Sequence, residues 1–188
     1  MWIKNERQYG FLNWSFDHTW YSISDSVFIT KMNQGQLYLK QELKMYKECN
    51  YRNKNDYIAF LKWLIKNGES FQDVDLEFSV KISKDSKSLI KYCYKNCWDI
   101  LIDYPQLKYY CGYAWNDRIT LPTQHAWLVN SKNQVVEPTF VIYGKELSEK
   151  YFGIHIPTKK LNALVFRENA VQNYLFDYFM DLQVKNSG

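Results

Sequence analysis

One stretch of the sequence constrains the fold more than any other: HAWLVNSKNQVVEPTF, at residues 125–140, reads as two short strands joined by a tight turn. A three-residue loop places Asn133 at the position that usually needs a left-handed backbone, which asparagine tolerates better than any residue except glycine. That loop pairs Val129 with Val135 across the hairpin. A four-residue loop is the alternative, and it shifts the pairing by one residue.

The register decides whether a histidine and a glutamate of this hairpin can meet. With the three-residue loop, Trp127 pairs with Glu137, and His125 lies on the same face of the sheet as both. His125 and Glu137 are then diagonal neighbours, within reach of a long side chain. The four-residue loop puts them on opposite faces. The alternative roles are structural: a strand histidine bonded to a backbone carbonyl, and a glutamate exposed at a strand end.

The rest of the chain shows helical patterns first, then a run of strands, then a closing helix, which is typical of an α+β fold. The expected helices are 36–48, 55–68 (capped by Asn55 or Asp56), 86–104 (capped by Ser86 or Ser88), a short one near 145–150, and 168–183. The expected strands are one or two within 11–29 (or an extended arm there), 74–82, 107–114, the hairpin 125–139, 152–156 and 161–166.

Length and composition suit one folded domain over residues 1–188, with 46% hydrophobic and 23% charged residues. The sequence has no apolar run of the roughly 20 residues that span a membrane, and its N-terminus lacks the apolar segment of a signal peptide. We therefore expect a soluble, cytoplasmic protein with no membrane partner. Residues 31–66 hold eight Lys and Arg against three acids, which suits either an acidic partner surface or a solvated helical face.

The cysteines are candidates for a nucleophile that a carboxylate-oriented histidine could serve as general base. In a cytosolic protein they are expected to be thiols: Cys49, Cys93, Cys97 and Cys111. A helix start lowers the pKa of a thiol, and Cys93 lies in the first or second turn of its expected helix, one turn before Cys97.

Structural alternatives remain for the same cysteines. Cys93 and Cys97 lie on an apolar stripe, where cysteine behaves as a small hydrophobic residue. A zinc site made by Cys93, Cys97 and His125 is a further alternative, although the sequence has no second cluster of ligands. Cys111 falls in an expected strand, away from any helix end, and Cys49 lies far off in the sequence.

Together these motifs resemble the transglutaminase-like branch of the papain-like cysteine peptidase superfamily, over roughly residues 86–142. In order they are CYKNC at a helix start, CGYAW with Gly112-Tyr113, HAWLV opening at His125, and VEPTF with Glu137-Pro138-Thr139. The segment YFGIHIP at 151–157 is similar to small uncharacterised phage and bacterial proteins with the same His-Ala-Trp hairpin. Residues 1–80 resemble nothing known to us and remain an unassigned N-terminal part.

The resemblance implies a nucleophile helix packed on a small antiparallel sheet, with a helical N-terminal part and a closing C-terminal helix. It implies a catalytic triad of Cys93, His125 and Glu137, although the family usually has aspartate at the third position. Trp115 and Trp127 are candidate substrate-binding residues. No cofactor and no metal are expected, and the oligomeric state stays open.

The expected function is thiol-dependent acyl transfer or hydrolysis on an amide or isopeptide bond of a protein or peptide. The sequence does not choose between proteolysis, deamidation and crosslinking. The alternative is a non-catalytic interaction module of the same fold, which would bind a protein or, less readily, a nucleic acid.

Overall fold

The computed structural model describes residues 34–48, 54–115, 122–143 and 150–186. Contacts divide the chain into Met1–Lys31 and Met32–Gly188, and every described residue belongs to the second unit. The strands expected within 11–29 lie outside the described residues, as does Cys49. Within the described ranges, no helix has the length and apolar character of a membrane span.

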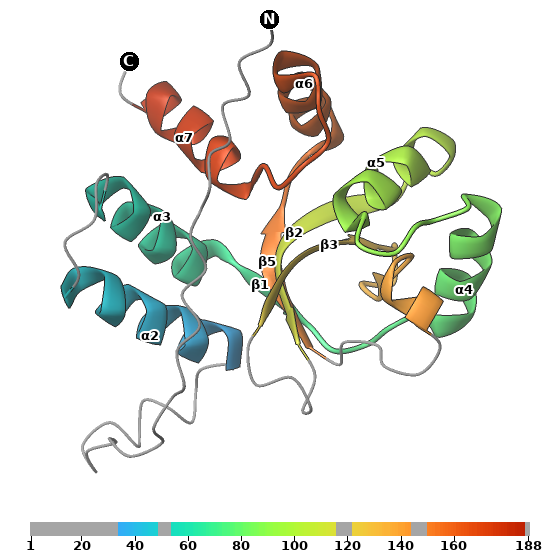
Figure 1. Ribbon diagram of the computed structural model, residues 1–188, viewed down its shortest axis with the longest axis horizontal. Coiled ribbons are helices and arrows are strands. Elements are labelled where there is room, and N and C mark those ends of the chain that lie inside the picture. Colours follow the sequence, from blue (N-terminus) through green and yellow to red (C-terminus); the bar gives the residue numbers. More distant parts are fainter. Residues whose placement is uncertain (1–33, 49–53, 116–121, 144–149, 187–188) are drawn as a thin grey trace, which may run out of the picture. The chain divides into compact units, whose positions relative to one another are not determined.

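The centre of the described unit is an antiparallel sheet of five strands, in the order β1-β5-β2-β3-β4, which curls in Figure 1. The strands are β1 (Glu69–Phe71), β2 (Lys108–Trp115), β3 (Thr123–Val129), β4 (Val135–Val136) and β5 (Lys150–His155). Since β2 has β3 on one side and β5 on the other, the strand that follows Cys93 and Cys97 in the sequence lies in the middle of the sheet. The strands predicted at 107–114 and 152–156 are confirmed.

The hairpin register agrees with the three-residue loop. Val129 pairs with Val135, and the backbone N–H of Asn130 donates to the carbonyl of Gln134 at 3.0 Å. Asn133 has a φ of 62°, the left-handed conformation expected of it. The loop length therefore keeps His125 and Glu137 in the register in which they can meet.

The two faces of the sheet are covered unequally. One face contributes alternate residues of β2, such as Tyr109 and Cys111, to the large core formed with the helices. The other carries a smaller cluster made by Phe71, Tyr110, Ala114, Trp127, Val129, Val135 and Tyr151. His125 alternates with the β3 residues of the large core, so it lies beside the smaller cluster.

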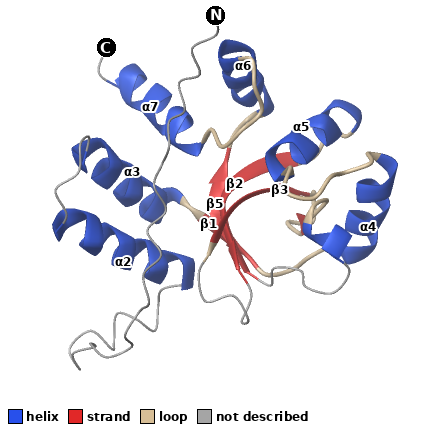
Figure 2. Ribbon diagram, viewed as in Figure 1, coloured by secondary structure: helices blue, strands red, loops and turns tan. Residues whose placement is uncertain are grey.

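Six helices occur in the described residues, and Figure 2 shows them around the sheet. They are α2 (Gln34–Glu48), α3 (Lys54–Asn67), α4 (Leu76–Asp85), α5 (Cys93–Asp103), α6 (Thr158–Glu168) and α7 (Leu175–Asn186), with a 3-10 helix, η2 (Phe140–Tyr143). The helices predicted at 36–48 and 55–68 are confirmed, but the predicted cap is wrong, because α3 already includes Lys54 and both Asn55 and Asp56 lie in its first turn. The prediction of an α+β fold is confirmed as well.

The strand predicted at 74–82 is wrong, because that segment forms α4. Asp75 caps the helix by accepting a hydrogen bond from the N–H of Phe78 at 3.1 Å. The buried residues Ser79, Ile82 and Ser83 follow helical spacing. The alternating apolar pattern is coincidental, since Leu76 remains 52% exposed.

Two predictions in the C-terminal part are corrected in the same way. The strand predicted at 161–166 is α6, whose buried Leu161, Leu164 and Val165 follow helical spacing. The closing helix predicted from 168 begins at Leu175 instead, after a left-handed Asn169 ends α6. The short helix expected near 145–150 falls mostly outside the described residues, and Lys150 opens β5.

The helix that carries Cys93 starts later than its predicted caps. Ser86 ends α4 instead of starting α5, and both Lys87 and Lys91 adopt positive φ, which interrupts any helix between them. Helix α5 therefore begins at Cys93 itself. It packs on β3, the strand that carries His125, and on β2.

Candidate active site

Cys93 occupies the first position of α5. Tyr92 precedes the helix without any side-chain capping bond, and the first turn contains no acidic residue. The thiol is therefore close to backbone N–H groups that no side chain caps, at the positive end of the helix dipole. The residue is 7% exposed, so it is largely shielded from water.

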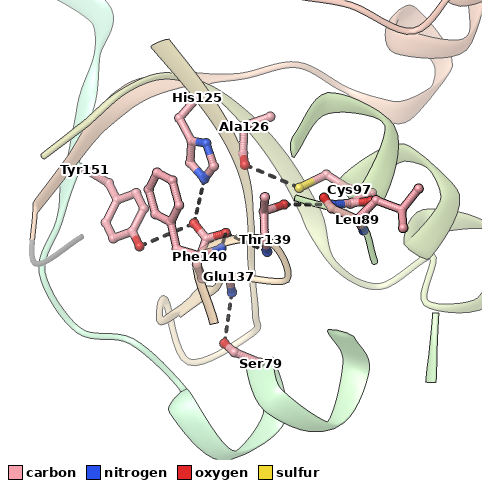
Figure 3. Close-up of polar contacts among 10 residues, drawn as sticks. Ser79, Leu89, Cys97, His125, Ala126, Glu137, Thr139, Phe140 and Tyr151 are labelled. Atoms are coloured by element: carbon pink, nitrogen blue, oxygen red, sulfur yellow. Dashed lines mark hydrogen bonds and ion pairs between the residues drawn. The ribbon is translucent and has the colours of Figure 1, made fainter. Parts of the chain in front are cut away.

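His125 and Glu137 form a buried pair. The Nε2 atom of His125 lies 2.7 Å from Oε2 of Glu137, and the two side chains are 2% and 0% exposed (Figure 3). The alternative roles considered from the sequence are therefore wrong: the histidine contacts a carboxylate through this nitrogen, and the glutamate is not exposed. Because Glu137 occupies Nε2, Nδ1 is the nitrogen left for the thiol.

Four further hydrogen bonds fix Glu137 in place. Its Oε1 accepts from the backbone N–H of Thr139 at 2.9 Å and of Phe140 at 3.0 Å. The hydroxyl of Tyr151 donates to Oε2 at 3.3 Å, and the Glu137 backbone N–H donates to Oγ of Ser79 at 2.9 Å. The acid is thus built to hold one orientation toward the imidazole.

An aromatic ring packs against one face of the imidazole. The rings of His125 and Phe140 are stacked, with centroids 4.0 Å apart and planes 3° from parallel. Phe140 follows Glu137 by three residues and donates its backbone N–H to the same carboxylate. The loop after β4 therefore fixes both the position and the plane of the base.

The pKa of His125 reflects these contacts. Burial, the largest single influence, lowers it, but the charge of Glu137, hydrogen bonds with Cys93 and Glu137, and the charge of Cys93 together raise the pKa to about 10. The environment thus favours the imidazolium over the neutral ring. The influence of Cys93 on the pKa of His125 indicates that the thiol lies near the imidazole.

The other two described cysteines are held in different surroundings. The thiol of Cys97 donates to the carbonyl of Ala126 at 3.4 Å, and that of Cys111 donates to Oδ1 of Asn173 at 3.3 Å. Both are 0% exposed, and burial raises the pKa of each. Among the described cysteines, Cys93 alone stands at the first position of a helix and contributes to the raised pKa of His125.

Asn96 is a residue of this site that sequence reasoning missed. It is buried, and its Nδ2 donates to the carbonyl of Leu89 at 2.7 Å and to Oγ1 of Thr139 at 2.9 Å. Its Oδ1 accepts from the N–H of Leu89 at 3.0 Å. One side chain thus ties the segment before Cys93 to the loop that carries Glu137. The feature of the sequence that could have revealed Asn96 is a polar residue within a helical segment that is otherwise buried.

The two tryptophans proposed for substrate binding lie in the interior. Trp115, at the end of β2, is 9% exposed and belongs to the large core. Trp127 is 0% exposed and stacks on Tyr110, with ring centroids 6.0 Å apart. The structure does not bring either side chain to the surface, and both have packing roles in this conformation.

Gly112, the other motif residue of β2, lies directly opposite His125 in the sheet and opposite Gly153 on β5. A Cβ atom at Gly112 would approach the carbonyl oxygen of Phe152 to 2.2 Å, which is too close for any side chain. The glycine therefore permits the strands to approach one another beside the base.

No group of three or more His, Cys, Asp or Glu side chains suited to a metal ion occurs among the described residues. The zinc alternative of Cys93, Cys97 and His125 also conflicts with the contacts, because Glu137 and Ala126 already engage two of those side chains.

Compared with known proteins, the chain matches no protein-family model, no curated protein and no solved structure. A thiol at a helix start, a histidine and a buried carboxylate together can generate a nucleophile, shuttle one proton and hold the base in one tautomer.

Proposed function

We propose that the protein catalyses thiol-dependent acyl transfer from an amide bond of a protein or peptide, with Cys93 as nucleophile, His125 as base and Glu137 as the orienting acid. The observation that carries the proposal is the buried contact of 2.7 Å between His125 and Glu137. The surroundings of this pair support the proposal, because Cys93, at the start of a helix, is among the groups that raise the pKa of the same imidazole.

The first step forms a thioester. The Cys93 sulfur attacks the carbonyl carbon of the amide, while its proton resides on His125, and the carbonyl oxygen takes up negative charge. The uncapped N–H groups at the start of α5, that of Cys93 first, are placed to stabilise this oxyanion. The imidazolium then gives its proton to the amide nitrogen, the C–N bond breaks, and the amine leaves.

The second step releases the acyl group. Water or a second amine attacks the thioester carbonyl, and His125 accepts a proton from the attacking group. Collapse of the intermediate breaks the C–S bond and restores the thiolate–imidazolium pair. Water gives hydrolysis or deamidation, and an amine gives a crosslink. Throughout, Glu137 keeps the proton-bearing Nε2 turned away from the thiol.

The proposal can be tested with a small activated ester, because acyl transfer to the thiol does not require the natural substrate. With p-nitrophenyl acetate we expect a burst of one nitrophenolate per chain and one acetyl group on Cys93. Treatment with hydroxylamine should remove that group, as it does from thioesters. The burst should disappear in Cys93→Ser and in His125→Asn, and should persist in the matched control Cys97→Ala.

Mass spectrometry of the acetylated peptides decides the outcome. Acetyl groups spread over lysines, or a Cys93 acetylation rate equal in the intact protein and in His125→Asn, would contradict the proposal. The non-catalytic interaction module expected as the alternative predicts that result.

A further inference from the structure

The four residues before the nucleophile form a turn that carries apolar side chains into water. The N–H of Tyr92 donates to the carbonyl of Leu89 at 3.3 Å, and Lys91 adopts a φ of 69° at the third position. Leu89, Ile90 and Tyr92 are 58%, 42% and 54% exposed. Three of the large exposed hydrophobic side chains of the described chain thus stand within four residues of Cys93.

The backbone of this turn is fixed. Asn96, itself 5% exposed, accepts a hydrogen bond from the N–H of Leu89 and donates one to its carbonyl, and donates another to Thr139 in the loop of the acid. Exposed apolar side chains on a mobile loop can fold away from water, but this turn holds them in place. Grouped apolar side chains that stay exposed mark binding surfaces.

The segment that follows Glu137 carries a further apolar side chain. Ile142 is 36% exposed and lies in η2, two residues after the Phe140 ring that stacks on His125. Exposed apolar groups therefore belong to the segments that hold both the nucleophile and the base.

The sequence around the turn has a net positive charge. Residues 81–92 contain four lysines and one aspartate, so their net charge is +3. Lys84, Lys87 and Lys91 are exposed, and none of them makes an ion pair within the described residues. Unpaired positive charge next to an apolar surface complements a ligand that is apolar at one position and acidic nearby.

We infer that the turn Leu89–Tyr92, with Lys87 and Lys91, is the docking element for the substrate, and that the substrate is a flexible protein segment with a large apolar residue beside the target amide and acidic residues flanking it. The inference rests on the proposed function, since it assigns the substrate class of the same site. Burying one large apolar side chain in this position should change binding by about tenfold or more.

The inference is testable with short peptides that carry a chloroacetamide group, which forms a bond between the Cys93 sulfur and the reagent's methylene carbon and releases chloride. Three peptides suffice: leucine followed by two glutamates, leucine followed by two lysines, and glycine followed by two glutamates. Each rate is divided by the rate with iodoacetamide in the same protein, so that only recognition beyond the reactive group is compared.

In the intact protein the leucine–glutamate peptide should react about tenfold faster, by this ratio, than either of the others. The double variant Leu89→Ser/Ile90→Ser should lose the preference for leucine over glycine. The double variant Lys87→Gln/Lys91→Gln should lose the preference for glutamate over lysine. Phe166→Ser, which removes an apolar side chain that is 75% exposed on α6, is the matched control and should keep both preferences.

Equal ratios for the three peptides in the intact protein would overturn the inference while leaving the proposed function intact, because iodoacetamide labelling that depends on His125 reports the triad separately. Preferences that survive in both double variants would also overturn it. Labelling of Cys93 that is independent of His125 would remove the proposed function, and this inference with it.

Discussion

The sheet carries two histidines in its strands, and their surroundings are opposite in effect. His125 on β3 is 2% exposed, lies 2.7 Å from a buried carboxylate and has its pKa raised to about 10. His155 on β5 is partly buried and packs beside Tyr110, with ring centroids 5.5 Å apart. Burial first, and then the charge of Lys108, lower the pKa of His155 in spite of an opposing influence from Glu69.

The comparison shows that a position in a strand and an aromatic neighbour are not sufficient to raise the pKa of a histidine. Both histidines have those features, but one alone has a carboxylate that is itself held by two backbone N–H groups. The loop after β4, which supplies Glu137 and Phe140, is therefore the feature that turns a strand histidine into the candidate base.

The largest expected effect comes from removing the charge of Glu137 while keeping its shape. In Glu137→Gln the amide nitrogen faces the imidazole, so the ring must accept through Nε2 and carry its proton on the side of the thiol. That tautomer cannot receive the proton of Cys93. The rate of acetylation by p-nitrophenyl acetate should fall by about 10²–10⁴, as for the acid of a serine protease triad.

His155→Asn is the matched control for that measurement and should change the rate by less than about twofold, within the range of an ordinary surface substitution. A comparable loss in His155→Asn, or none in Glu137→Gln, would mean that the carboxylate is not what distinguishes the two histidines.

Glu137→Asp tests whether the length of the acidic side chain matters, because the two carboxylate oxygens of Glu137 have separate partners. One accepts from the N–H groups of Thr139 and Phe140, and the other faces His125. A side chain one methylene shorter cannot keep both sets of contacts in a fixed backbone. We therefore expect a loss in acetylation rate close to that of Glu137→Gln. A mild effect would show that the loop can move to follow the shorter side chain.

A smaller loss is expected from Asn96→Ala, which acts on the site without touching the reacting atoms. It frees the turn before Cys93 from the loop of Glu137 and leaves buried backbone groups of Leu89 without their partners, at a cost of about 1–3 kcal/mol in stability. The acetylation rate should fall by about tenfold, an order-of-magnitude figure for one lost positioning contact. The dependence of the Asn96→Ala acetylation rate on pH should shift to higher pH, a change that a purely structural role of Asn96 would not produce.

Cys97→Ala provides the control at the next position of the same helix. Alanine should be tolerated there, because the single thiol bond of Cys97 to the carbonyl of Ala126 is weak. A shift of the pH profile in Cys97→Ala as large as that in Asn96→Ala would assign the effect to general loosening of α5.

The smallest effect concerns stability against pH, measured in Cys93→Ser so that no thiol titrates beside the base. Glu137 still favours the imidazolium, so the stabilisation is fully present below about pH 6.5, the unfolded value, and is lost as the pH rises through the folded value. Relative to Cys93→Ser/His125→Asn, the free energy of unfolding should fall above pH 6.5 by at most about 1.4 kcal/mol per pH unit.

His155 should show the opposite sign, because its folded pKa is lowered. Its contribution is present above about pH 6.5 and is lost as the pH falls through the folded value. Urea unfolding of the intact protein and of His155→Asn between pH 5 and 7 measures this. Equal signs for the two histidines would contradict the comparison.

The part of the site that is formed by residues close together in the chain could be predicted from the sequence. A loop of three residues ending in Asn133 determines the hairpin register, and the register places His125 within reach of Glu137, as observed. Both follow from contacts between residues close in the chain. The cysteine at the helix start was predictable in kind, although the helix begins later than its serines suggested.

The contacts that complete the site join residues far apart in the chain, so periodicity could not reveal them. Asn96 reaches Thr139 across 43 positions, and Ser79 reaches Glu137 across 58. The alternation of apolar residues in 74–82 also predicts a strand that would contain Ser79. The segment is instead a helix capped by Asp75. Which face of that segment is buried depends on tertiary packing.

The most direct test of the triad is the rate of Cys93 alkylation by iodoacetamide as a function of pH, followed by mass spectrometry of the labelled peptides. An ordinary thiol with a pKa near 8.5 is only about 0.3% ionised at pH 6. A thiolate paired with the His125 imidazolium should react at pH 6 about 100-fold faster than the same cysteine in His125→Asn, and well before Cys97 or Cys111. His155→Asn should react like the intact protein. A Cys93 rate that rises only near pH 8.5, and does so equally with and without His125, would contradict the account.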